Sequence, residues 1–429
     1  MRVLCAGDLH LGRRSSRIPV DLDGPGFSSA AAWDAIVDCA IDQQVDLLAL
    51  SGDLVDRANR YFEALGPLER GLRRLGQAGI PACAVSGNHD FDVLPRLVDS
   101  LPSDGFQLLG RGGRWERVTV QGRDGDALHV DGWSFPEEYV VQNPLDAYQG
   151  AADGLPVLAL LHADLDQPRS LYGPVPLADL QRQPVALWLL GHIHAPRELC
   201  PAGGPVVLYP GTPQALDPGE PMPHGVWLAE IGPGATRLRR VSISTVEYHP
   251  LSIDLTGIDT PEALQQHLAD TVRGALRQTH GRPESSRVRC VCCRVRLTGR
   301  TRLHRQLRGL VDGQLADLVL SLDDATAVVE HVTYDTRPAF ELAGIAGRND
   351  PPGEVARLIQ ALGQSEVPDD CREIVARALD RLRDIHRSSA FNEVSGDLEP
   401  TPDAARALLL AEAWSLLDTL VAQREEARA

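Results

Sequence analysis

Long apolar segments are absent from this sequence of 429 residues. No run of about 18 apolar residues occurs, so we expect no membrane-spanning helix and no membrane partner. The first residues, MRVLCAGDLHLG, turn acidic after a short apolar run, which is not the pattern of a secretory signal peptide. We therefore expect a cytoplasmic protein.

Positive charge is also scarce. Lysine and arginine number 42 against 59 aspartates and glutamates, and the net charge is −17. Such a balance argues against a general nucleic-acid binder, which usually carries a positive field. Residues 285–311 are an exception, because they hold eight arginines and no acidic residue. This stretch is either a solvated face or a surface that contacts phosphates.

The eight cysteines lack the paired spacing of a zinc site. Most of them lie inside apolar runs, where a small buried thiol is expected. The CVCC cluster, Cys290–Cys293, could bind a metal or sense redox state. We expect instead a strand that packs small side chains.

The pattern along the chain predicts an α/β fold. RVLCAGD, VDLLALSGD and IPACAVSGNHD are typical of buried strands, and helical periodicity lies between them over residues 28–44 and 62–75. This alternation predicts parallel pairing. From about residue 115 the strands follow one another closely. We therefore expect a two-sheet sandwich with helices on its outer faces, over residues 1–250.

The composition changes twice after residue 250. The pattern of residues 251–335 predicts a small α/β module, and that of residues 336–429 predicts mostly helices. The length suits two or three domains. We expect three parts, 1–250, 251–335 and 336–429.

Five polar motifs follow the predicted strands of the first part. They are GDLH (Asp8, His10), SGDLVD (Asp53, Asp56), SGNHD (Asn88, His89, Asp90), LLHAD (His162) and LLGHIH (His192, His194). Catalytic and binding groups of open α/β sheets collect at the carboxyl ends of strands. Side chains two apart on an extended segment point the same way, so Asp8 with His10, and His192 with His194, can converge.

The residue types in these motifs indicate metal chemistry. Carboxylates, an amide and imidazoles suit Mn²⁺, Fe²⁺ or Zn²⁺ better than Mg²⁺ or Ca²⁺. The set is too large for one ion. Two ions about 3.5–4 Å apart, sharing a bridging carboxylate, would use it fully.

In this order, the five motifs resemble those of the calcineurin-like metallophosphoesterases, over roughly residues 1–250. The resemblance implies two sets of metal ligands: Asp8, His10 and His194 for one ion, and Asn88, His162 and His192 for the other. It also implies that Asp53 bridges the ions, that His89 is the proton donor, and that Asp56 orients His89.

Within this superfamily the chain is similar to the SbcD-type DNA repair exonucleases, relatives of the nuclease subunit of Mre–Rad complexes. The supporting motifs are MRVLCAGDLHLG, SGDLVDR, AVSGNHD and YPGTPQAL, whereas SLYGPVPLADL, RVRLTGRTRLHRQL and NDPPGEVARLI are closest to the YhaO-like branch. The similarity implies DNA as substrate, a small capping domain, and C-terminal helices that bind an SMC-like or Rad-like ATPase. It also implies that the protein can form a homodimer.

We therefore predict a DNA exonuclease that acts in DNA repair and depends on two divalent ions, which we expect to be Mn²⁺. A metal-activated water would attack the phosphodiester, and His89 would supply the proton. Two alternatives remain. One is a small-molecule phosphodiesterase or phosphatase of the same superfamily, and the other is a scaffold that binds DNA ends or a partner.

Overall fold

The computed structural model describes residues 1–19, 22, 24–57, 60–101, 105–150, 154–199, 204–221, 223–232, 234–312, 318–364, 366–386 and 400–426. The chain forms two compact units. One comprises Met1–Ser252, His267–Arg296 and Asp312–Thr333, and the other Ile253–Gln266, Leu297–Val311 and Tyr334–Ala429. No helix in the described ranges is long and apolar enough to cross a membrane. The linear division at residues 250 and 335 stays a prediction.

The first sheet has six strands in the order β14-β13-β1-β2-β3-β4. Their bounds are β1 Arg2–Ala6, β2 Leu47–Leu50, β3 Ala82–Ala84, β4 Phe106–Leu108, β13 Gly225–Gly232 and β14 Ala235–Ser242. Strands β1 to β4 are parallel, and β13 is antiparallel to both β1 and β14. The parallel connections contain α1 (Ser29–Asp42), α2 (Tyr61–Gln77) and α3 (Val93–Ser100), and the short helix η1 (Pro25–Phe27) precedes α1.

The second sheet also has six strands, in the order β11-β12-β10-β7-β6-β5. Their bounds are β5 Glu116–Gln121, β6 Ala127–Trp133, β7 Val157–His162, β10 Leu187–Gly191, β11 Arg197–Leu199 and β12 Val206–Tyr209. Strands β6, β7, β10 and β12 are parallel. The segments between them hold η3 (Pro144–Ala147), the short pair β8 (Asp164–Leu165) and β9 (Pro174–Val175), and α4 (Leu177–Gln181).

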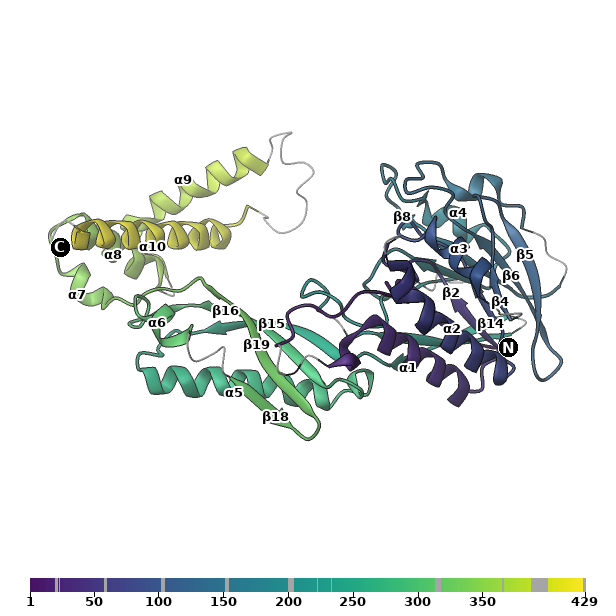
Figure 1. Ribbon diagram of the computed structural model, residues 1–429. Coiled ribbons are helices and arrows are strands. Elements are labelled where there is room, and N and C mark those ends of the chain that lie inside the picture. The colour runs from purple at the N-terminus through teal and green to yellow at the C-terminus, as the bar shows by residue number, and fades with distance from the viewer. Residues whose placement is uncertain are drawn as a thin grey trace. The chain divides into compact units, whose positions relative to one another are not determined.

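The core lies between the sheets because alternate residues of a strand face opposite sides. Val3 of β1 belongs to a buried cluster that also contains Leu158 of β7. Its neighbour Leu4 belongs to a different cluster, shared with α1 and α2, which lie side by side in Figure 1. On the second sheet, Trp188 shares a cluster with Leu180 of α4. The predicted two-sheet sandwich with outer helices is confirmed.

Helix α1 is capped by the residue that precedes it, Ser28. The Ser28 hydroxyl accepts the Ala31 N–H at 3.2 Å, which satisfies one of the free amides of the first turn. Trp33 on this helix is fully buried, and its Nε1 donates to the Pro67 carbonyl of α2 at 2.9 Å. A Cβ at Gly71 would lie 2.6 Å from Trp33 Cε2. Glycine at position 71 therefore permits the close packing of α1 and α2.

A third sheet has the order β15-β16-β19-β18. Its strands are β15 Val246–Asp254, β16 Cys290–Thr298, β18 Val319–Leu322 and β19 Ala325–Tyr334, and this part also contains α5 (Pro261–His280) and η4 (Pro283–Ser285). Cys290, Cys292 and Cys293 are buried on β16, with 3.6 Å between the Sγ atoms of the first two. Among the described residues, no group of potential metal ligands includes them. The expectation of a packed strand fits this arrangement.

Glu247 is a buried carboxylate on β15, with 1% of its side chain exposed. Its Oε1 lies 2.6 Å from His249 Nε2, its Oε2 accepts the Ser285 hydroxyl at 2.6 Å, and Arg282 pairs with it. Burial raises the pKa of Glu247, but the hydrogen bonds with His249 and Ser285 outweigh it and hold the pKa below its usual value.

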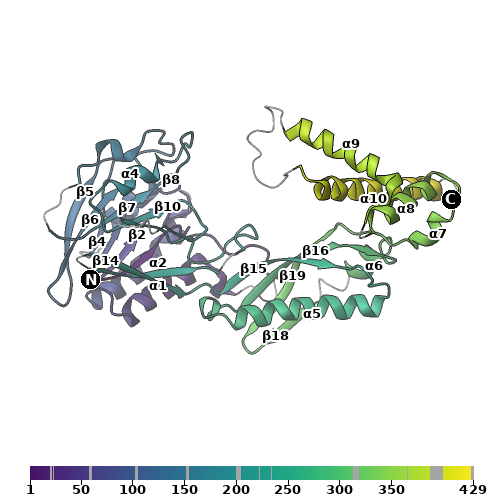
Figure 2. The ribbon, with the colours of Figure 1, turned by 180° about the vertical axis from the view of Figure 1, so that it is seen from behind.

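The second unit is mainly helical. Its elements are β17 Arg300–Thr301, α6 Leu307–Val311, β20 Arg337–Pro338, α7 Leu342–Ala346, α8 Pro351–Leu362, α9 Asp369–His386 and α10 Pro402–Glu426. Ile359 of α8 and Leu417 of α10 share a buried cluster, and the two helices lie side by side in Figure 2. Arg300 donates to both carboxylate oxygens of Asp418, at 2.8 and 2.9 Å. Its guanidinium lies 4.0 Å from the ring centroid of Trp414, which ties β17 to α10.

Candidate metal centre

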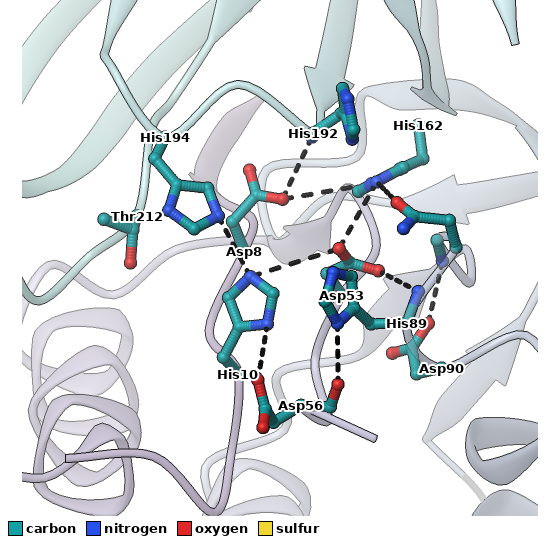
Figure 3. Close-up of polar contacts among 12 residues, drawn as sticks. Asp8, His10, Asp53, Asp56, His89, Asp90, His162, His192, His194 and Thr212 are labelled. Atoms are coloured by element: carbon teal, nitrogen blue, oxygen red, sulfur yellow. Dashed lines mark hydrogen bonds and ion pairs between the residues drawn. The ribbon is translucent and has the colours of Figure 1, made fainter. Parts of the chain in front are cut away.

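The predicted site residues lie at the carboxyl ends of five strands, drawn from both sheets of the sandwich. Asp8 and His10 follow β1, Asp53 follows β2, Asn88 and His89 follow β3, His162 ends β7, and His192 and His194 follow β10. Figure 3 shows the side chains of Asp8, His10, Asp53, His162 and His194 gathered in one place. The parallel strands therefore bring together groups that are up to about 180 residues apart in sequence, as in other open α/β sheets.

The backbone of these loops turns sharply at the polar residues. Asp8, His10 and Asp53 have φ values of 51°, 48° and 49°, and His192 has 97°. The extended geometry from which we predicted convergence is therefore wrong, and left-handed turns direct the side chains inward. Such conformations cost of order 1–3 kcal/mol each in residues other than glycine, and they cluster at functional sites.

Two side-chain pairs lie around the Asp53 carboxylate, one of two histidines and one of a histidine and an asparagine. His10 Nε2 lies 3.0 Å from His194 Nε2 and 4.0 Å from Asp53 Oδ2. His162 Nε2 lies 3.0 Å from Asn88 Oδ1 and 3.5 Å from the same Asp53 oxygen. Asp53 is thus within reach of both halves of the cluster, the position that a shared ligand requires.

Three overlapping groups of potential ligands result. They are Asp8, His10 and His194; His10, Asp53 and His89; and Asp8, Asp53 and His162. Within each group the ligand atoms all lie within 4.8 Å of one another. Asp8, His10 and Asp53 each belong to two groups, so the groups form one continuous cluster.

His192 lies beside these groups and belongs to none of them. Its backbone N–H donates to Asp8 Oδ1 at 2.9 Å, and its ring centroid is 5.3 Å from that of His162. Its Nε2 lies 3.5 Å from Asp164 Oδ1. Burial, and then the charge of His162, lower the pKa of His192, which favours the neutral imidazole that metals bind.

His89 is also within the cluster, although we predicted it as a proton donor and not as a ligand. Its Nδ1 lies 2.8 Å from the Asp56 backbone oxygen. The orienting contact that we expected from Asp56 is therefore made by its carbonyl, because the Asp56 carboxylate lies against His10, 3.4 Å from Nδ1. The His89 backbone N–H donates to Asp53 Oδ1 at 2.9 Å.

The donor set fits divalent cations. Asp8 Oδ2 is buried and has no hydrogen-bond partner among the described residues. A buried carboxylate oxygen without a partner is costly unless a cation or a donor compensates for it. Burial raises the pKa of Asp53, but the charges of His162 and His10 outweigh it and lower the pKa. The carboxylate is therefore held in the ionised form that binds metal.

The sequence pattern assigned no role to Asp90, which the structure shows to be central. Asp90 is fully buried, and its Oδ2 accepts the N–H groups of Leu54 at 2.7 Å and Val55 at 3.3 Å. Its Oδ1 accepts the Gly87 N–H at 2.8 Å. Asp90 thus ties the loop that carries Asp53 to its own loop. Its place in the SGNHD motif was the only signal available.

Glu220 was missed altogether. It lies in the loop between β12 and β13, and its Oε1 is 2.6 Å from His194 Nδ1. Burial lowers the pKa of His194, but the hydrogen bond with Glu220 and the charge of Asp8 outweigh it and raise the pKa. Burial likewise raises the pKa of Glu220, and His194 with the Leu216 N–H outweighs it and lowers the pKa. A glutamate in a segment rich in proline and glycine carries no sequence signal for this contact.

Acidic residues from elsewhere in the chain neutralise part of the arginine-rich stretch 285–311. Arg289 pairs with Asp324 at 3.1 Å, and Arg294 pairs with Glu330 at 2.6 Å. These pairs reduce the positive charge that the stretch presents to solvent.

Family models match both the sandwich and the segment that follows it. Residues 1–196 match the model described as calcineurin-like phosphoesterase. Residues 248–337 match the model described as metallophosphoesterase YhaO, middle domain. The first match covers the strand ends that carry His162, His192 and His194.

Curated relatives match a similar part of the chain. The chain is 28% identical over 273 residues to the uncharacterized metallophosphoesterase YhaO of Bacillus subtilis, covering 62% of this chain and 66% of YhaO. It is 28% identical over 285 residues to the DNA double-strand break repair protein Mre11 of Haloferax volcanii, covering 63% of this chain and 58% of that protein. Both matches span less than two thirds of the relative's length. The protein of the same name from Halobacterium salinarum is 27% identical over 283 residues, covering 63% of this chain and 67% of its own.

The comparisons thus give two domain types and two groups of relatives. The chain carries a calcineurin-like metallophosphoesterase domain followed by a middle domain of the YhaO type, and it is homologous to YhaO and to the Mre11 proteins.

Proposed function

We propose that the chain is a metal-dependent phosphodiesterase that degrades DNA as an exonuclease in DNA repair. The observation that supports this most strongly is the continuous cluster of ligand groups around Asp53, at the strand ends of a phosphoesterase domain. Homology to proteins named for DNA double-strand break repair supports DNA as the substrate.

The cofactor we propose is a pair of Mn²⁺ ions. Asp8, His10 and His194 would hold one ion, and Asn88, His162 and His192 the other, with Asp53 shared. When bound, such ions neutralise phosphate oxygens and lower the pKa of a water ligand to about 7. The partnerless Asp8 Oδ2 and the buried imidazoles support this assignment.

His89 is the proposed proton donor. A carbonyl oxygen can only accept, so His89 Nδ1 carries a hydrogen and donates it to the Asp56 oxygen. Nε2 is then the ring atom that can carry a second proton toward the substrate. Departure of the sugar oxygen as an alkoxide requires such a proton or hydrogen bond. The Asp56 contact prevents the ring from turning away.

End-labelled linear duplex DNA tests the proposal. We expect the purified chain to shorten this DNA in the presence of Mn²⁺, and we expect the cleavage to stop when a chelator is added. His89→Gln should lower the rate about 10²- to 10⁴-fold, the usual contribution of a positioned acid or base. Asp53→Asn should also lower the rate, because it removes the carboxylate that the two ions would share. His331→Gln, an exposed histidine on β19, is the matched control and should cleave normally.

Other outcomes of this assay separate the alternatives. The absence of any Mn²⁺-dependent cleavage would contradict the nuclease proposal. Cleavage of a small chromogenic diester without cleavage of DNA would favour a small-molecule phosphodiesterase. Tight binding of DNA ends by a chain that cleaves neither substrate would favour a scaffold.

We also propose that the C-terminal helices bind an SMC-like ATPase. Apolar side chains are exposed on both long helices: Ile374 and Ile385 on α9, and Leu408 and Leu416 on α10, between 38% and 50% exposed. Leu416→Glu should weaken binding to the coiled coil of such an ATPase, measured by calorimetry, whereas Ala407→Glu, exposed on the opposite side of α10 from Leu416, should not. Equal binding by both variants would contradict the assignment of this face.

A further inference from the structure

Glu220 and the candidate metal centre lie on opposite sides of the His194 ring. Glu220 Oε1 is 2.6 Å from His194 Nδ1, and His194 Nε2 is 3.0 Å from His10 Nε2. The His194 backbone is also held, because its carbonyl accepts the Thr212 N–H at 3.0 Å. Figure 3 shows His194 between Thr212 and the cluster.

The Glu220 carboxylate is itself fixed by its own loop. Its Oε2 accepts the N–H groups of Leu216 at 2.7 Å and Asp217 at 3.3 Å. Its backbone carbonyl lies 3.2 Å from Nε2 of the buried His224. The side chain is 13% exposed. These contacts leave Oε1 as the one oxygen directed at His194, and they do so without any contribution from the metal centre.

The contact determines which nitrogen of His194 carries the hydrogen. An ionised carboxylate can only accept, so His194 Nδ1 is the donor, and Nε2 of the neutral ring keeps its lone pair. His162 has the same arrangement with a different partner, because its Nδ1 lies 3.1 Å from the Ser51 carbonyl oxygen and its Nε2 faces Asn88. Metal-binding histidines generally have such a partner on the second nitrogen.

We propose that Glu220 is a positioning residue that holds His194 with its Nε2 lone pair directed at the metal centre. The inference rests on the proposed function, because it requires His194 to be a metal ligand. It adds the loop between β12 and β13 to the machinery of a centre whose predicted ligands all lie at strand ends.

Replacement of Glu220 by glutamine distinguishes this role from a packing role. The N–H groups of Leu216 and Asp217 require an acceptor, so the glutamine oxygen must take the place of Oε2. The NH₂ group then faces His194 Nδ1, which has to become an acceptor. That tautomer carries its hydrogen on Nε2 and cannot bind a metal. An isosteric change that keeps the packing therefore removes the ligand.

Mn²⁺ binding to the full chain provides the test. Calorimetry would compare wild type, Glu220→Gln, Glu220→Ala and the control Glu230→Gln, which makes the same change at an exposed glutamate on β13 that pairs with Arg2. We expect the affinity for one of two Mn²⁺ ions to fall about 10- to 100-fold in Glu220→Gln, at least as far as in Glu220→Ala. Electron spin echo spectra of bound Mn²⁺ should lose the signal of one histidine nitrogen in Glu220→Gln, and the spectra of Glu230→Gln should match those of wild type.

The contrary outcomes are distinct. Wild-type affinity for both ions in Glu220→Gln, or weakening in Glu220→Ala alone, would overturn the positioning role, because a packing role spares the isosteric variant. If Glu220→Ala does not fold, the comparison of Glu220→Gln with the control Glu230→Gln still tests the positioning role. A wild-type chain that binds no Mn²⁺ would instead refute the proposed function, and the role of Glu220 with it.

Discussion

Asp90 should contribute more to the stability of the sandwich than any exposed carboxylate nearby. Replacement by alanine removes the acceptor of three buried amides, those of Leu54, Val55 and Gly87. A buried donor without a partner costs about 1–3 kcal/mol. The Val55 bond is long at 3.3 Å and contributes least. We therefore expect Asp90→Ala to lower the free energy of unfolding by about 3–5 kcal/mol.

Asparagine at position 90 should lower the free energy of unfolding by less than alanine does. Its oxygen can serve the two amides at Oδ2, but its NH₂ group then faces the Gly87 N–H, so one hydrogen bond is lost and two donors oppose each other. We expect Asp90→Asn to lower the free energy of unfolding by about 2 kcal/mol.

Urea unfolding followed by tryptophan fluorescence measures both changes at Asp90, because Trp33 and Trp188 are buried in the sandwich. Asp92→Ala is the control, since the Asp92 side chain is partly exposed and pairs with Arg96 on the surface. A change of less than about 1 kcal/mol in Asp90→Ala, or the same change in Asp92→Ala, would refute the argument from buried amides.

Three further predictions concern other parts of the chain. Gly71→Ala should lower the free energy of unfolding by about 1–3 kcal/mol, because its Cβ would overlap the Trp33 ring; unchanged urea midpoints would contradict this. The pKa of Glu247 is lowered on folding, so its contribution is present above the unfolded pKa of about 4.3 and is lost as the pH falls through the lower folded-state pKa. In Glu247→Gln the stability should therefore fall less steeply as the pH is lowered, measured by urea midpoints from neutral pH to about pH 3. The same pH dependence as in wild type would refute this role of Glu247. Arg300→Lys keeps the charge but loses the double hydrogen bond to Asp418 and the stacking on Trp414, so calorimetry should show the free energy of unfolding lowered by about 1–2 kcal/mol. If Asp418 is first replaced by asparagine, the loss should become smaller and only the share due to stacking should remain; an unchanged loss would contradict a contribution from Asp418.

Much of the sandwich could be predicted because its signals are local. Apolar runs such as VDLLALSGD end in Gly-Asp, and segments with helical periodicity lie between such runs. The order of strands, polar loops and helices can therefore be recognised in the sequence. The candidate ligands were found because each follows a strand, and parallel strands bring their carboxyl ends to one edge.

The geometry within that edge could not be predicted from spacing. The rule that alternate side chains share a face assumes an extended backbone, whereas Asp8 and His10 lie in left-handed turns. These turns are set by bonds to another loop, from Asp8 N to Gly52 O at 3.0 Å and from His10 N to Asp53 O at 2.9 Å. A pairing of loops that are more than 40 residues apart leaves no periodic trace in the sequence.

By itself, the sequence determined the sandwich, the order of the polar motifs and the inventory of carboxylates, imidazoles and an amide, because hydrophobic period and residue chemistry are properties of short segments. Only the tertiary structure decided that Asp53 lies between His10 and His162, and that Glu220 holds His194. Those contacts join strands and loops from distant segments. Their distances depend on how the two sheets pack, and a hydrogen bond is lost within about half an ångström of displacement beyond its usual length.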